Sequence, residues 1–174
     1  MMRLRRAGGG DARALSLVGA ATFLETYALM LSAQDILEHC ATKHSAVHYA
    51  EWLADPAWRL WLAEVDPGGA PIGYIASGPV ASPIADLSPD DVEVHRIYVL
   101  SKFHGTGVGA QLMQAACAES AAAGARRALL GVNKQNQRAL AFYAKAGFSV
   151  VGERKFLVGA IAHDDFVLAR PLAP

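Results

Sequence analysis

This chain of 174 residues has only two cysteines, no net charge and no long apolar run, and each of these features excludes a class of protein or partner. The two cysteines, Cys40 and Cys117, provide neither a disulfide framework nor metal-ligand spacing, so we expect buried free thiols in a reducing cytosol. Sixteen basic and sixteen acidic residues balance, so the charge does not favour nucleic acid or a membrane surface as a partner. No run reaches the roughly 18 apolar residues of a membrane-spanning helix.

The N-terminal segment is the one place where an export signal must be considered. An apolar stretch from Ala14 to Leu24 has the length of a signal-peptide core and follows four arginines, at positions 3, 5, 6 and 13. Against export, Asp11 lies in the basic region, and Glu25 follows the stretch without a clear small-residue cleavage site. We therefore expect a cytoplasmic protein.

The composition that remains is that of a globular chain. Hydrophobic residues make up 53% and charged residues 18%, which argues against disorder. The length fits one domain with a sizeable core, and there are no internal repeats or low-complexity linkers. We predict a single domain over residues 1–174, with a helical N-terminal region at about 11–55 and a core at about 58–170.

The first third of the chain predicts one strand and three helices. Residues 2–7 form the candidate strand, and Asp11 is a suitable N-cap for a helix that runs to about Leu31. Its predicted inner stripe consists of Leu17, Ala21, Leu24, Ala28 and Leu31. Ser32 can cap a second helix, and a third ends at Asp55-Pro56. His44 and His48 are one turn apart but have no third ligand in view, so we expect partly exposed helical histidines and no metal site.

From Trp58 onward the pattern changes to that of strands. We predict a hairpin of residues 58–65 and 72–80, a loop at 81–91 and a central strand from Val92 to Val99. A long helix (107–123), a strand (125–132) and a helix that starts at Gln135 or Asn136 and is closed by Gly147 come next. The chain ends in an antiparallel pair around residues 159–163. Mixed strands and helices of this kind predict an α+β fold with a mixed sheet.

Three glycines at alternate positions, Gly105, Gly107 and Gly109, separate the central strand from the long helix. A strand, a glycine-rich turn and a helix N-terminus together build an anion site, because small residues let backbone N–H groups approach a phosphate. Ala110 and Gln111 follow the glycines, so the lysine of a nucleoside-triphosphate loop is missing. The spacing also differs from that of a dinucleotide-binding loop, and an ordinary turn is the remaining alternative.

A second motif identifies the family. Asn136, Ala139 and Tyr143 lie at i, i+3 and i+7, on one face of the predicted helix. With RIYV at 96–99, HGTGVG at 104–109 and the pattern N-x-x-A-x-x-F-Y-x-x-x-G-F at 136–148, the chain resembles the GNAT family of N-acetyltransferases over about residues 58–170. The resemblance implies a mostly antiparallel central sheet of about six or seven strands with a splayed central strand, flanked by about four helices.

The resemblance also implies acetyl-CoA as the co-substrate. In that family the backbone at the end of the central strand holds the pantetheine arm and the glycine turn holds the pyrophosphate. The corresponding residues here are Ile97, Tyr98, Val99, His104, Gly105, Thr106, Gly107, Val108 and Gly109, with Asn136 and Tyr143 from the later helix. The sequence departs from the family pattern at position 104, where His replaces the usual Arg or Gln and leaves the role of this side chain open.

Acetyl transfer to an amine requires a proton acceptor and a proton donor but no Ser or Cys nucleophile. Neutralising an alkyl amine of pKa near 10.4 at pH 7 costs about 4.6 kcal/mol, so a base or a water relay is useful. Glu93 matches an acidic position common in the family and is the candidate base; the alternative is a carboxylate paired with Arg96 or Lys102. Tyr143 is the candidate acid for the departing thiolate; the alternative is a core tyrosine.

The acceptor is the least specified part of the prediction. The closing stretch 155–172 and the helical N-terminal region look like the PaiA-type polyamine acetyltransferases, which favours a small polyamine-like amine. A cationic acceptor needs acidic groups, and the available ones are Glu25, Glu38, Glu51, Asp164 and Asp165, each of which is otherwise a surface charge. A protein or peptide amine, or a degenerate acyl-CoA-binding regulatory module, are the alternatives. Dimers are frequent in the family, so a homodimer is the assembly to test.

Overall fold

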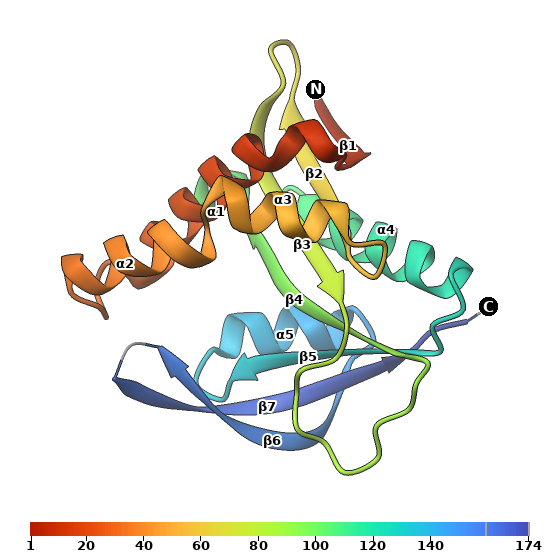
Figure 1. The fold of residues 1–174 in the computed structure, drawn as a ribbon. Helices are drawn as coiled ribbons and strands as arrows, with labels where there is room; N and C mark the ends of the chain where they lie inside the picture. Colours follow the sequence, from red (N-terminus) through yellow and green to blue (C-terminus); the bar gives the residue numbers. More distant parts are fainter. Residues whose placement is uncertain (159, 174) are drawn as a thin grey trace. The chain divides into compact units, whose positions relative to one another are not determined.

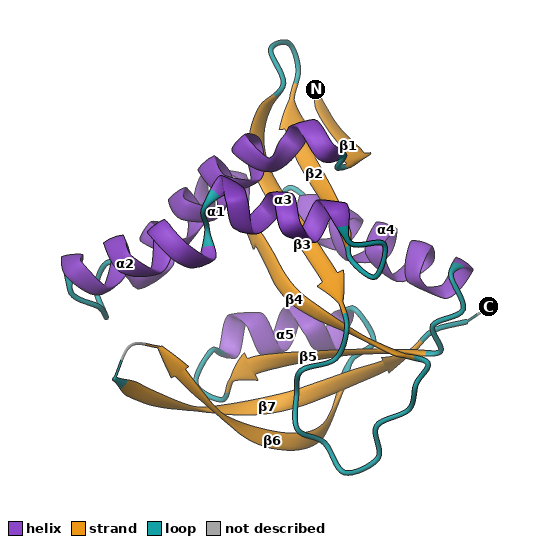
Figure 2. Cartoon of the chain, in the orientation of Figure 1, coloured by secondary structure: helices purple, strands orange, loops and turns teal. Residues whose placement is uncertain are grey.

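The computed structural model, which describes residues 1–158 and 160–173, contains both helices and strands (Figures 1 and 2). The α-helices within these residues are α1 (Ala12–Tyr27), α2 (Ala33–Lys43), α3 (Ala46–Ala54), α4 (Val108–Ala122) and α5 (Gln137–Lys145). The strands are β1 (Met2–Arg6), β2 (Arg59–Val65), β3 (Ala70–Gly78), β4 (Asp91–Val99), β5 (Arg127–Asn133), β6 (Ser149–Val158) and β7 (Ile161–Pro171). Two short 3-10 helices, η1 (Gly9–Asp11) and η2 (Ser101–Phe103), precede α1 and follow β4. None of the described helices is long and apolar enough to cross a bilayer.

The seven strands follow the order β1-β2-β3-β4-β5-β7-β6. The outer pairs β1–β2, β5–β7 and β6–β7 are antiparallel, and β4–β5 is parallel. This arrangement confirms the predicted α+β fold with a mixed, mostly antiparallel sheet. The parallel pairing is short, from Asp91–Glu93 on β4 to Arg127–Leu129 on β5.

The chain divides into two compact units, and it passes from one unit to the other within β3, within β4 and within α4. The first contains residues 1–76 and 96–116, and the second contains residues 77–95 and 117–174. The first unit therefore holds all three N-terminal helices together with the glycine turn. That a single domain spans residues 1–174 stays a prediction.

Serine caps define the helices of the first unit. The Ser32 hydroxyl accepts the Asp35 N–H at 3.1 Å, as predicted, and the Ser45 hydroxyl accepts the His48 N–H at 3.1 Å. Each bond satisfies an N–H that the first helical turn leaves without an acceptor. Helix α3 ends at Ala54, just before Pro56, also as predicted.

The predicted inner stripe of α1 was wrong. Leu17 and Leu24 are 65% and 52% exposed. The buried side of the helix consists of Leu15, Val18, Gly19, Thr22 and Phe23. Apolar residues occur on every side of this helix, so their spacing does not select a face. The face is selected by Tyr49, because a Cβ on Gly19 would lie 2.4 Å from the Tyr49 hydroxyl.

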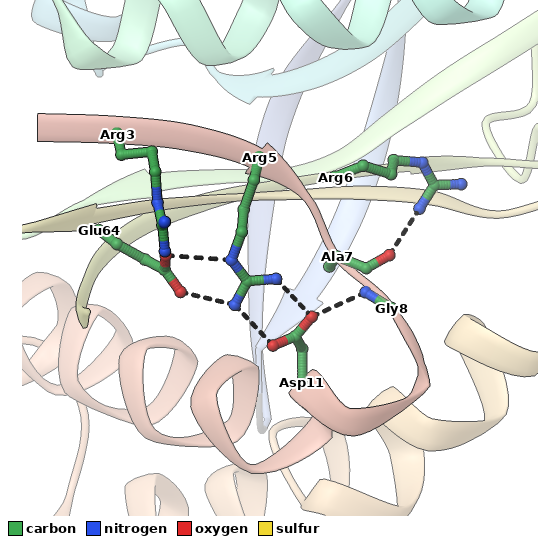
Figure 3. A network of polar contacts seen from close by, with 7 residues as sticks. All are labelled: Arg3, Arg5, Arg6, Ala7, Gly8, Asp11 and Glu64. Atoms are coloured by element: carbon green, nitrogen blue, oxygen red, sulfur yellow. Dashed lines mark hydrogen bonds and ion pairs between the residues drawn. The ribbon is translucent and has the colours of Figure 1, made fainter. Parts of the chain in front are cut away.

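Strand β1 joins the sheet through β2, and an arginine fixes its end to α1 (Figure 3). The Arg5 guanidinium lies between two carboxylates, with contacts of 2.6 and 3.0 Å to Glu64 and two of 2.7 Å to Asp11. Asp11 is the N-cap residue as predicted, but its carboxylate binds Arg5 and the Gly8 N–H instead of capping α1. The Arg5 hydrogen bonds lower the pKa of both carboxyl groups.

We expect Arg5→Met to lower the free energy of unfolding by about 1–3 kcal/mol, because Glu64 and Asp11 lose a shared donor in a partly buried site. Urea unfolding of this variant and of Arg13→Met, which changes an exposed arginine on α1, measures the effect. Carboxyl groups with lowered pKa stabilise the fold above their ordinary values of 3.8 and 4.5. The difference from wild type should therefore shrink as the pH falls below 4.5; a constant difference would contradict this origin.

The second unit is built on the β5–β7–β6 ladder and α5. A register shift between Val150 and Gly152 marks a bulge in β6. The Asn136 side chain accepts the Ala139 N–H at 3.1 Å as the N-cap of α5, and Gly147 follows the helix with φ +88°, both as predicted. The final turn is shorter than predicted, since β7 already begins at Ile161, and Gly159 lies outside the described residues.

Candidate active site

The glycine turn of the first unit has the conformation that its residues predict. Gly105 and Gly107 have φ values of +81° and +87°, a region that favours glycine. Residues 104–107 are exposed, whereas Val108 is buried and anchors the first turn of α4. The Gln111 N–H donates to the Gly107 carbonyl at 3.0 Å, so the internal hydrogen bonds of α4 begin there. The preceding amides lie in the first turn of a helix, where an anion is favoured.

The end of β4 is held close to β3 and to α1. A Cβ on Gly73 would lie 2.9 Å from the Tyr98 carbonyl oxygen and 3.0 Å from a Val99 methyl, so glycine permits this approach of the two strands. Glu25 of α1 accepts hydrogen bonds from the Ser101 N–H and hydroxyl at 3.0 and 2.9 Å. These contacts fix the chain just after Ile97–Val99.

The His104 side chain connects the glycine turn to the end of β4. Its Nε2 lies 2.7 Å from the Val99 carbonyl oxygen. Because a carbonyl oxygen only accepts, Nε2 carries the proton and donates it. The imidazole therefore points back toward β4, and the histidine that replaces the usual Arg or Gln connects the glycine turn to the end of that strand.

Asn136 and Tyr143 belong to the second unit, on α5. The Asn136 side-chain oxygen caps the helix, so the amide has a structural function besides any contact with a ligand. The Tyr143 ring is partly buried and meets Phe142 and Phe148 edge-on, at centroid distances of 5.3 and 6.1 Å. The predicted site residues are thus divided, with Ile97–Gly109 in the first unit and Glu93, Asn136 and Tyr143 in the second.

Glu93 is 2% exposed and anchors the loop that precedes β4. Its carboxylate accepts the Ala81 and Ser82 N–H groups at 2.7 and 2.9 Å and the Ser82 hydroxyl at 2.7 Å. Burial acts to raise the pKa of Glu93, but these hydrogen bonds and the nearby His95 outweigh it and lower the pKa. A carboxylate so fully engaged is a weak proton acceptor, and the arrangement favours a structural role over that of a base.

The ion-pair partner of Glu93 is Arg154, not Arg96 or Lys102, the two partners considered in the alternative to a base role. Arg154 Nη1 lies 3.2 Å from Glu93 and 2.8 Å from the Ser82 hydroxyl, and Nε lies 3.4 Å from Asp165. The guanidinium covers Gly131 of β5, where a Cβ would lie 2.0 Å from it. One arginine of β6 therefore contacts β4, β7 and the loop, and it does so because position 131 has no side chain.

We expect Glu93→Gln to lower the free energy of unfolding by about 1–3 kcal/mol, because one carboxylate oxygen becomes an NH₂ group that faces donors. Denaturant unfolding beside Glu153→Gln, which changes an exposed carboxylate paired with Lys134, tests this loop-anchoring role. A base role has a different signature, namely unchanged stability together with the loss of the rising limb of the pH–rate profile. That pair of results would overturn the structural interpretation.

The acidic residues expected to surround a polyamine have other contacts within their own units. Glu25 binds Ser101, Glu38 accepts from Gln34 at 2.6 Å, Asp164 pairs with Lys155, and Asp165 is buried beside Arg154. Glu51 is exposed on α3. Within either unit, the described residues therefore do not assemble an acidic cleft. Nor do they bring three His, Cys, Asp or Glu side chains together as metal ligands.

A cluster that the sequence did not indicate lies among α1, α2, α3 and the strands of the first unit. His44 is 3% exposed, so the expectation of a partly exposed histidine was wrong for it. Its Nδ1 lies 2.9 Å from the Tyr49 hydroxyl, which also contacts the Tyr74 hydroxyl at 3.0 Å and Arg96 Nη1 at 2.9 Å. Burial, and then the Arg96 charge, lowers the pKa of His44 to about 3. In the sequence, the one-turn spacing of His44 and His48 did not reveal their tyrosine and arginine neighbours.

Comparisons with known proteins place these features in context. The sequence profile of the acetyltransferase (GNAT) family matches residues 25–148. An uncharacterized N-acetyltransferase of Mycobacterium tuberculosis is 36% identical over 162 residues, which are 93% of this chain and 98% of the relative.

Two solved structures show a similar fold. The PaiA N-acetyltransferase of Thermoplasma acidophilum in complex with coenzyme A matches 98% of this chain and 99% of its own, with a TM-score of 0.78 and 21% identity. A spermidine N-acetyltransferase chimera from Vibrio cholerae and hSSAT matches 98% of this chain and 95% of its own, with a TM-score of 0.71 and 19% identity. At these identities the structural likeness concerns the fold alone.

Proposed function

Because the chain belongs to the acetyltransferase (GNAT) family and is an acetyl-CoA-dependent N-acetyltransferase, we propose that it acetylates the primary amine of a small molecule by direct attack. The observation that carries the proposal is the exposed turn at Gly105 and Gly107, whose two left-handed glycines lead into the first turn of α4. This turn fits a pyrophosphate, because backbone N–H groups and the helix dipole both favour negative charge there.

The chain offers two sets of groups for the co-substrate. In our proposal the backbone of Ile97–Val99 holds the pantetheine arm, and the amides of residues 104–109 hold the pyrophosphate. Asn136 and Tyr143, on α5 of the second unit, are also proposed to bind acetyl-CoA, as the family resemblance implies. Acetyl-CoA supplies the activated acetyl group. The protein binds and orients it and provides the groups for proton transfer.

Proton transfer is assigned to Tyr143, which is proposed to protonate the departing thiolate because a phenol on α5 can donate a proton. Glu93, the base expected from the sequence, has its oxygens hydrogen-bonded to the loop at 81–82, so in our proposal it holds that loop and the amine loses its proton to water. Backbone N–H groups near Tyr98 and Val99 are proposed to stabilise the developing oxyanion.

The polyamine preference expected from the sequence has little support beyond the fold. The likeness to the PaiA and spermidine enzymes lies at 21% and 19% identity. Four of the five acidic residues expected around a polyamine, all but Glu51, also have partners of their own. We therefore propose a small primary amine as the acceptor and treat spermidine as one candidate among several.

The first test follows free thiol while the pure protein is incubated with acetyl-CoA and single amines: spermidine, spermine, amino acids, amino-acid amides, aminoglycosides and short peptides. We expect release above the hydrolysis rate with at least one small amine. Tight acetyl-CoA binding without release from any amine would favour a regulatory module, and release with peptides alone would favour a protein acceptor. Either result would contradict the proposed acceptor class.

We expect Tyr143→Phe to lower kcat by about a hundredfold, because the thiolate then leaves without its proton donor. Its dissociation constant for acetyl-CoA, measured by calorimetry, should stay within about twofold of wild type, since no phosphate contact is changed. Unchanged kcat with the best amine of the first test would remove Tyr143 from the mechanism. A parallel loss of acetyl-CoA binding would instead show that the tyrosine only shapes the site.

A further inference from the structure

We propose that Arg96 binds a carboxylate on the acceptor, so that the small amine acetylated by this protein is one that also carries an acidic group. The inference rests on the proposed function and names the class of acceptor. It is carried by the contacts of one guanidinium at the centre of the cluster formed by α1, α2, α3 and the C-terminal half of β4.

The Arg96 guanidinium is held rigidly. Its Nη1 donates to the Lys43 carbonyl at 2.7 Å, at the C-terminal end of α2, and to the Tyr49 hydroxyl at 2.9 Å. Its central carbon lies 4.6 Å from the centre of the Trp52 ring and 5.4 Å from that of Tyr49. Two hydrogen bonds and two ring faces fix its orientation, so little conformational freedom is left to lose when a ligand binds.

The other edge of the same guanidinium is unmatched. An arginine has five N–H donors, and Nη1 accounts for the contacts with Lys43 and Tyr49. In residues 1–158 and 160–173, neither Nε nor Nη2 of Arg96 has an acceptor, and no Asp or Glu forms an ion pair with it. The Nε and Nη2 edge is the one that takes a carboxylate through two parallel hydrogen bonds.

The groups around Arg96 are basic or neutral, which favours an anion over a polyamine. Those that titrate are His39, His44, Lys43, His48, Tyr49 and Tyr74, with Glu51 as the acidic member. Burial, and then the charge of Arg96, lowers the pKa of all three histidines. The buried Nε2 of His48 has no hydrogen-bond partner within the described chain, which leaves a second polar atom for a ligand.

Turnover of matched acceptors tests the proposal. Glycine, phenylalanine and lysine are each compared with the corresponding amide, which keeps the α-amine and loses the carboxylate. We expect the best acid to exceed its amide in kcat/KM by about tenfold or more, in line with hydrogen bonds to a charged group. Arg96→Gln should abolish this preference, with kcat/KM for the amide within about twofold of the wild-type value. Arg13→Gln, which changes an exposed arginine of α1, should keep the preference.

A binding measurement keeps the proposal testable if Arg96→Gln fails to fold. The pKa values of His39 and His48 in the wild-type protein are followed by NMR with N-acetylphenylalanine and with its neutral amide. The acid should raise both pKa values, because it neutralises the Arg96 charge, and the amide should not. Arg96→Lys, which keeps the charge without the two-pronged edge, should weaken binding of the acid about tenfold.

Different results would contradict the acetylation of a small amine and the binding of a carboxylate by Arg96. Thiol release with equal kcat/KM for acids and amides, or a preference for spermidine, overturns the role of Arg96 and leaves the acetyltransferase intact. A preference for phosphoethanolamine over ethanolamine, without any difference between acids and amides, overturns the carboxylate in favour of a phosphate. Absence of thiol release with every amine overturns the proposed small-amine acceptor, and the histidine titration then decides on Arg96 alone.

Discussion

The arrangement of the second unit depends on the ion pairs of one arginine. Arg154 of β6 extends over β5 to Glu93 on β4, contacts Asp165 on β7 and reaches the Ser82 hydroxyl in the loop before β4. Glu93 in turn accepts two backbone N–H groups of that loop. Burying a charge is costly unless it is paired and hydrogen-bonded; here Arg154 and Glu93 each have several partners, and Asp165 has Arg154. The residue expected to be a base thus connects the loop to the sheet.

Features that depend on neighbouring residues could be predicted from the sequence. The serine cap of α2, the asparagine cap of α5 and the glycine after α5 require only local hydrogen bonds or a local φ value. The same holds for Gly105 and Gly107, whose left-handed conformation follows from the need for a tight turn between β4 and α4. These local features, in their order along the chain, were also sufficient to indicate the family and its sheet.

Features that depend on distant residues could not be predicted. Arg154 is 61 residues from Glu93, so no local spacing indicated that pair over Arg96 or Lys102. Helix α1 has apolar residues all round, and its buried face is set by Tyr49 against Gly19. Asp11 was identified as the cap residue, but its carboxylate binds Arg5, whose guanidinium is also held by Glu64 of β2. In each of these cases, contacts with residues distant in the sequence determine what the side chain binds or whether it is buried.

The absence of a side chain at Gly131 restricts how this protein can change during evolution. The φ angle of this glycine is not in the left-handed region, so its value lies in the space it leaves for the Arg154 guanidinium. An alanine there would displace the guanidinium and leave Glu93 and Asp165 as buried carboxylates without their cation. Relatives with a larger residue at this position should therefore also have replaced the arginine and both acids, so that the four positions are inherited as a set.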